Sequence, residues 1–184
     1  MTENQRFIKP ENLVYSALFI ALGLLIPRIF HVMGPNAGKM FLPMYYSVVL
    51  AALLLPMRFT IPVAVCTPIL SYILTGMPAI PMLYVLLCEL VIYAIVANLL
   101  IRRYNPYITV VIASLTGRVV NVCTVLFLAH VIGLPIPFAK TPILMGTMIM
   151  SVPGIVLQIV LIPMIYKRVG QRIGIKGEKC DTGL

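Results

Sequence analysis

Residues 82–101 read MLYVLLCELVIYAIVANLLI, a run of twenty residues in which Glu89 is the only charged side chain. About twenty apolar residues is the length that an α-helix needs to cross the hydrocarbon core of a bilayer. Two arginines and then Asn105-Pro106 follow the run, which is the pattern of a turn at the membrane surface. The stretch therefore predicts a transmembrane helix.

Five further apolar segments flank this one, at about residues 13–29, 41–55, 61–75, 107–131 and 142–166. Of the 184 residues 61% are hydrophobic and 10% are charged, whereas a soluble domain averages about 45–50% and about 25%. Because lipid offers no partner to an unpaired backbone group, the spans are expected to be helices. The sequence predicts an all-α bundle of six transmembrane helices, with residues 1–184 forming a single membrane domain.

Two of these segments, 41–55 and 61–75, are shorter than a perpendicular span requires. They are expected to be tilted, partly re-entrant or covered by protein. Pro43, Pro62 and Pro68 lie in them, and a proline inside a helix bends it.

The basic residues set an orientation, because cytoplasmic loops carry an excess of lysine and arginine. Six spans place both termini on one side. If that side is the cytoplasm, residues 1–10 and the tail 167–184 lie inside. The ten inside bases are then Arg6, Lys9, Arg58, Arg102, Arg103, Lys167, Arg168, Arg172, Lys176 and Lys179. Only Arg28, Lys39 and Lys140 lie outside, and Arg118 falls within a span. The sequence therefore predicts cytoplasmic termini, and the net charge of +9 is read as topogenic, with no nucleic-acid partner.

Glu89 and Arg118 are the two charges that topology does not explain. A charge at the centre of a bilayer costs at least about 2.5–3.5 kcal/mol, so it usually faces protein or a polar cavity. Two readings remain open: a Glu89–Arg118 ion pair that locks two helices together, or a polar site that receives a ligand. The two readings are compatible with each other.

Other polar side chains lie at comparable depth. Arg118 and Asn121 are three residues apart and share a helix face, as Glu89 and Tyr93 do at a spacing of four. Gln158 is in the middle of the last span. Each of these alone is more often a contact between helices than a ligand contact, but together they indicate a polar pocket that opens outward.

The first outer loop adds an amide, a cation and aromatic rings, which are Asn36, Lys39, Tyr45 and Tyr46. Tyrosines are common as interfacial anchors, and that reading stays open. The same groups would suit a lid over a small anionic or heteroaromatic ligand.

Several classes of enzyme and site are disfavoured. The sequence has no Gly-x-x-x-x-Gly-Lys-Ser/Thr loop for ATP, and no His-Glu-x-x-His or Gly-x-Ser-x-Gly motif. Its four cysteines form no C-x-x-C pair, and its two histidines lie near predicted outer loops, so neither a metal nor another cofactor is expected. We therefore expect that the chain is not an enzyme.

Helix 13–29 carries Ala17-x-x-x-Ala21, a small-xxx-small pattern that allows close approach of another helix. With it, the chain resembles the substrate-binding S-components of energy-coupling factor (ECF) vitamin transporters over nearly its whole length. The residues that carry the resemblance, by their order and spacing, are Ala17 and Ala21, the stretches 38–44 (GKMFLPM) and 68–78 (PILSYILTGMP), Glu89-Leu90 with Tyr93, 117–120 (GRVV), and Pro153-Gly154 with Gln158.

The resemblance implies a six-helix subunit of a bacterial-type plasma membrane that captures a vitamin or related micronutrient for ATP-driven uptake. Its partners would be a transmembrane coupling subunit, docked on Ala17 and Ala21, and two cytoplasmic ATPase subunits that hydrolyse the ATP. The candidate substrate-binding residues are Asn36, Lys39, Tyr45, Tyr46, Glu89, Tyr93, Arg118, Asn121 and Gln158. Tyr45 stands where many relatives of this group have histidine, so cobalamin, folate, pantothenate and a deazaguanine precursor all remain open as substrates.

Two other functions remain open. The first is a stand-alone secondary carrier or channel that works as a homo-oligomer, for which Glu89 is the one intramembrane acid. The second is a membrane enzyme that uses Glu89 or His31, although the sequence shows no nucleophile–base arrangement.

Overall fold

A computed structural model describes residues 10–32, 43–76, 78, 80–130 and 141–173. These residues form helices and turns, and no strand occurs among them. The helices are α1 (Pro10–Val32), α3 (Pro43–Leu54), α4 (Met57–Thr75), α5 (Met82–Leu100), α6 (Pro106–His130) and α7 (Thr141–Ile173). The six predicted helical segments are thus confirmed, and Pro10 stands at the first position of α1, where proline is well tolerated.

Five of the helices, α1, α4, α5, α6 and α7, are long and apolar enough to cross a membrane. The expectation that residues 61–75 form a short segment is wrong, because α4 already begins at Met57 and has 19 residues. Its first turn includes the exposed Arg58, whose long side chain can keep its charge at the membrane surface while the backbone stays helical. The lengths and composition indicate a multi-pass membrane protein.

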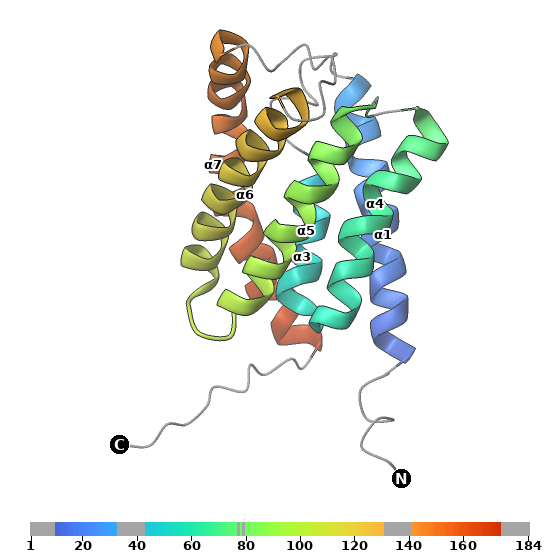
Figure 1. Cartoon of the computed structure of the whole chain (residues 1–184). Coiled ribbons are helices and arrows are strands. Elements are labelled where there is room, and N and C mark those ends of the chain that lie inside the picture. Colours follow the sequence, from blue (N-terminus) through green and yellow to red (C-terminus); the bar gives the residue numbers. More distant parts are fainter. Residues whose placement is uncertain (1–9, 33–42, 77, 79, 131–140, 174–184) are drawn as a thin grey trace.

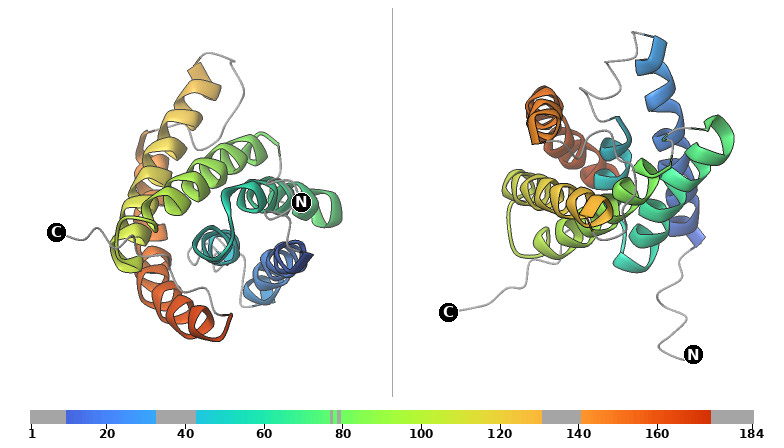
Figure 2. Two further views of the ribbon diagram at one scale, coloured as in Figure 1. Left: turned by 90° about the horizontal axis from the view of Figure 1, so that it is seen from below. Right: turned by 45° about the horizontal axis from the view of Figure 1, so that its top comes forward.

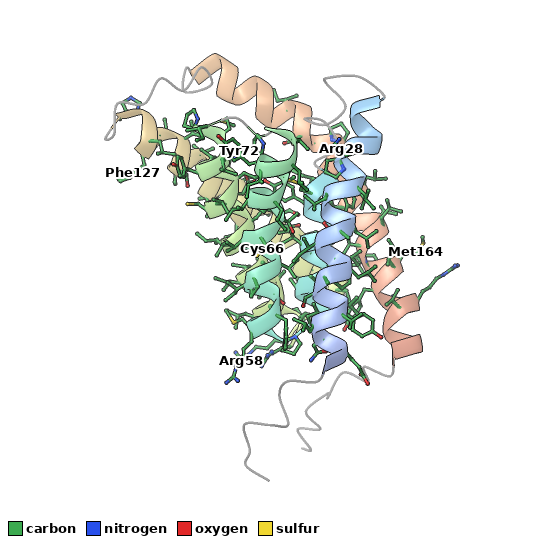
Figure 3. All side chains as sticks on the ribbon, turned by 90° about the vertical axis from the view of Figure 1, so that its right-hand side faces the viewer. Arg28, Arg58, Cys66, Tyr72, Phe127 and Met164 are labelled. Atoms are coloured by element: carbon green, nitrogen blue, oxygen red, sulfur yellow. The ribbon has the colours of Figure 1, made fainter. Side chains whose placement is uncertain are left out.

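Successive helices run in alternating directions (Figure 1). The start of α1 and the end of α7 lie at the same end of the bundle, which is the lower end in Figure 1. Arg58 lies at this lower end and Arg28 near the opposite end (Figure 3). We call the first end the terminal end and the other the far end. The helix α7 continues to Ile173, so Lys167 and Arg168 belong to its last turns and not to a tail.

The short helix α3, with 12 residues, is the centre of the bundle. Seen along the bundle, it lies inside the ring that the other helices form (Figure 2). Val48, Val49, Ala51 and Ala52 are each 0% exposed. Of the three arrangements expected for segment 41–55, the structure shows the one in which protein covers it.

The last turn of α3 is held by side chains of neighbouring helices. The amide of Asn98 on α5 donates to the carbonyls of Ala52 and Leu55, both at 2.8 Å. The Thr60 hydroxyl on α4 lies within 3.4 Å of the Ala51 carbonyl and 3.3 Å of the Leu55 carbonyl. The carbonyls at a helix end lack helical partners, and these side chains supply donors to the carbonyls of Ala52 and Leu55.

Glycines allow close helix contacts at two places. A Cβ atom on Gly23 of α1 would lie 2.6 Å from Cγ2 of Thr67 and 2.7 Å from Oγ of Ser47. A Cβ atom on Gly117 of α6 would lie 3.0 Å from Cδ2 of Tyr93. Small residues at such crossings let membrane helices pack closely.

The outer surface of the bundle is apolar. Large side chains such as Leu13, Ile73, Leu115, Val119 and Ile149 are between 63% and 71% exposed. In water this surface would promote aggregation, whereas in a bilayer it faces hydrocarbon.

Candidate functional site

The two unexplained charges meet in the interior of the bundle. Nη1 of Arg118 on α6 lies 3.5 Å from Oε1 of Glu89 on α5. The amide of Asn121, one turn after Arg118, donates to Oε2 of Glu89 at 2.6 Å. The Glu89 side chain is 2% exposed, so its charge depends on these neighbours, and the predicted ion pair is confirmed.

Tyr45 joins the ion pair from the first turn of α3. Cζ of Arg118 lies 5.6 Å from the centroid of the Tyr45 ring. The same ring meets the ring of Tyr93 edge to face, with centroids 5.7 Å apart. A cation over an aromatic face is attracted by the ring quadrupole, so Tyr45 packs against the arginine of the pair.

Tyr93 extends the cluster towards α7. Its hydroxyl lies 3.0 Å from Oγ of Ser114 and donates to Oε1 of Gln158 at 3.2 Å. The hydroxyl of Tyr46 donates to the carbonyl of Gly154, also on α7, at 3.3 Å. Polar side chains from α3, α5, α6 and α7 thus form one buried group, which we call the polar cluster. Its members are Tyr45, Tyr46, Glu89, Tyr93, Arg118, Asn121 and Gln158.

Two atoms of the polar cluster make no hydrogen bond. Within the described part of the chain, Nε2 of Gln158 and Oε1 of Glu89 are buried and have no hydrogen-bond partner. For Oε1 the contact with Arg118 is an ion pair at 3.5 Å, which is too long for a hydrogen bond. Gln158 is 1% exposed. Buried polar atoms are nearly always hydrogen-bonded, so each exception calls for an explanation.

The structure brings together seven of the nine residues that the sequence singled out for the ligand site. The other two, Asn36 and Lys39, lie outside the described residues. Sequence reasoning missed Ser114, which supports the Tyr93 hydroxyl. Its spacing carried the signal, because Ser114 precedes Arg118 by four residues and therefore shares its helix face.

The surface of α1 separates its small residues into two groups. Gly23 is buried against Thr67 and Ser47, whereas Ala17 and Ala21 are both exposed. Large exposed side chains border the alanines, among them Val14, Leu18 and Leu25, which are 67%, 52% and 59% exposed. The alanines therefore lie in a shallow stretch of an otherwise bulky outer face, which we call the alanine face.

In the described ranges, no group of three or more histidine, cysteine, aspartate or glutamate side chains is placed to hold a metal ion. Comparison of the chain with protein-family models, with curated proteins and with solved structures gave no significant match.

Proposed function

We propose that this protein is the substrate-binding subunit of an ECF-type importer. It captures a vitamin-like micronutrient from outside the cell, and a transmembrane coupling subunit with two cytoplasmic ATPases supplies the energy for release inside. The observation that carries the proposal is the coexistence of two features. A polar cluster is buried within the bundle, and the alanine face lies on the outside of α1.

The polar cluster supports capture of a ligand. It gathers a carboxylate, a guanidinium, two amides and three tyrosines from four helices, at a depth where each such group is costly. An ion pair alone would lock α5 to α6 without Gln158, Tyr46 or Asn121. Convergent polar groups in an apolar surrounding are the usual make-up of a small-molecule site.

The alanine face supports docking of a partner. Helices associate in lipid through close van der Waals contact, which small side chains permit. Ala17 and Ala21 are one turn apart and both exposed, so a helix of another subunit can approach the α1 backbone there. Gly23, which serves contacts inside the bundle, is not available for this role.

The proposal places the terminal end in the cytoplasm of a bacterial-type plasma membrane. Arg58, Arg102 and Arg103 are exposed near that end, as are Lys167 and Arg168, which agrees with the preference of basic residues for the cytoplasmic side. The far end, where α3 begins, is then the side from which the ligand arrives.

Single tryptophans test the docking face. The chain has no tryptophan, so Ala17→Trp, Ala21→Trp and the control Val119→Trp each introduce one bulky side chain and one fluorophore. Val119 is 63% exposed on α6 and matches the alanines in facing the apolar surroundings. Each variant is co-expressed with a coupling subunit and its two ATPases, and complex formation is measured by co-purification.

We expect the two α1 variants to lose the complex and Val119→Trp to retain it. Quenching of the tryptophan by brominated lipid, measured without partners, shows that all three positions face lipid in a folded protein. If Ala17→Trp and Ala21→Trp still form the complex, the alanine face is not the docking site. If the wild-type protein transports a substrate in liposomes without ATPases, the stand-alone carrier is correct instead.

A further inference from the structure

The two atoms of the polar cluster that lack a hydrogen bond differ in kind. Nε2 of Gln158 can only donate a hydrogen bond, and Oε1 of the ionised Glu89 can only accept one. Tyr93 connects them, because its hydroxyl binds Gln158 and it lies one helical turn after Glu89. A ligand that satisfies both must therefore offer an acceptor and a donor together.

The charge of the polar cluster limits the ligand further. Glu89 contributes one negative charge and Arg118 one positive charge, and the remaining members are neutral at neutral pH. These two charges already neutralise each other, because their atoms lie 3.5 Å apart. A carboxylate, phosphate or ammonium group would leave one charge in excess in a buried place, where an uncompensated charge is strongly unfavourable.

From these observations we propose that the group of the ligand that enters the polar cluster is a neutral amide edge. Its carbonyl oxygen accepts from Nε2 of Gln158 and its N–H donates to Oε1 of Glu89. Lactams, cyclic ureas and carboxamides have this chemistry. The inference rests on the proposed function in so far as it assumes that the polar cluster receives a ligand, but it does not depend on the ECF partners.

The test uses three ring compounds of similar size as probes. The first, 2-pyridone, carries both the carbonyl and the N–H, whereas 1-methyl-2-pyridone keeps only the carbonyl. Benzoate carries a charged carboxylate. Binding of each at millimolar concentration to the purified full-length protein is measured by saturation-transfer NMR, and affinities are compared by titration.

We expect 2-pyridone to bind, 1-methyl-2-pyridone to bind roughly tenfold or more weakly, and benzoate not to bind. The factor follows because a buried acceptor that loses its donor costs on the order of one tenfold step in affinity or more. Equal affinities for the two pyridones, stronger binding of benzoate, or no binding of any probe would each overturn the proposal. These measurements need no variant, so a folding defect cannot obscure them.

Two variants locate the site. Gln158→Met keeps the length of the side chain and removes the donor, while Tyr93 keeps its contact with Ser114. The matched control is Thr109→Val. Within the described residues the Thr109 hydroxyl is likewise buried and without a hydrogen-bond partner. It lies in the first turn of α6, twelve residues before Asn121.

We expect Gln158→Met to weaken 2-pyridone binding roughly tenfold or more and Thr109→Val to leave it unchanged. If both variants weaken binding equally, the probe does not recognise Gln158 and the proposal fails. Its failure leaves the co-purification experiment on α1 unaffected, so the two proposals are tested separately.

Discussion

The Glu89–Arg118 pair allows a quantitative prediction by a double-mutant cycle, in which Glu89→Gln and Arg118→Gln are made singly and together. At 3.5 Å and an effective dielectric constant of about 20, the Coulomb attraction is about 5 kcal/mol. This is an upper limit to the coupling, because Asn121 also binds the carboxylate and the Arg118 side chain is 18% exposed. We expect a coupling energy of about 2–3 kcal/mol.

Each single variant should lower the free energy of unfolding by about 3–5 kcal/mol, because it leaves one buried charge without its partner. The double variant should cost less than the sum of the two. The assay is reversible unfolding in mixed detergent micelles, followed by far-ultraviolet circular dichroism. A second cycle on Lys167 and Tyr107 is the control, since the ammonium lies 5.0 Å from the ring centroid at an exposed site, where such a pair contributes about 0.5–1 kcal/mol.

Additive effects at Glu89 and Arg118, within about 0.5 kcal/mol, would refute the reasoning. The exchange Glu89→Arg with Arg118→Glu then separates the two roles of the pair. We expect it to recover part of the stability and still to lose 2-pyridone binding, because the acceptor has moved to another helix. Recovery of stability with unchanged affinity would make the pair a fold lock only.

Two further predictions concern the packing of the bundle. Gly23→Ala places a Cβ atom 2.6 Å from Cγ2 of Thr67, so we expect a loss of about 1–2 kcal/mol in the same unfolding assay, since overpacking exceeds the gain in helix propensity. Adding Thr67→Ala removes that methyl group but leaves Oγ of Ser47 at 2.7 Å, so it should recover part of the loss; no recovery would mean that Gly23 is not limited by the Thr67 contact. Asn98→Leu leaves the carbonyls of Ala52 and Leu55 without these donors. It should cost about 2–3 kcal/mol and speed hydrogen exchange at the end of α3, and unchanged exchange there would contradict the role given to Asn98.

Helix positions and local faces could be predicted from the sequence. Spans are set by length and hydropathy, because lipid requires a continuous apolar helix. Residues three or four positions apart lie on the same face of a helix. This spacing predicted that Tyr93 lies beside Glu89 and that Asn121 lies beside Arg118. The contact between Glu89 and Arg118 was foreseen for a different reason, since two buried opposite charges stabilise each other.

The order of the helices around the bundle could not be predicted. Lipid is as apolar as the interior, so hydropathy does not show which face of a membrane helix is buried. For this reason nothing in residues 43–54 distinguished a central helix from a peripheral one. The contacts of Tyr93 with Gln158 and of Tyr46 with Gly154 cross between helices far apart in the sequence, and only the packing of the chain reveals them.

The position of α3 bears on the choice between a receptor and a channel. Its 12 residues rise about 18 Å, which is less than the hydrocarbon thickness of about 30 Å. The helix begins at the polar cluster, with Tyr45 and Tyr46 in its first turns, and continues to the terminal end. Between these two points, Val48, Val49, Ala51 and Ala52 of α3 fill the centre of the bundle and are 0% exposed.

A ligand held at the polar cluster therefore meets a packed apolar helix on the side of the terminal end. Opening a path through that side would separate α3 from Asn98, which donates to the carbonyls of Ala52 and Leu55, and would leave each carbonyl without this donor at a cost of about 1–3 kcal/mol. Spontaneous passage through this chain alone is thus opposed by the same contacts that fix α3. A subunit that captures its ligand from one side and depends on ATP-driven partners for release accords better with this packing than an autonomous channel does.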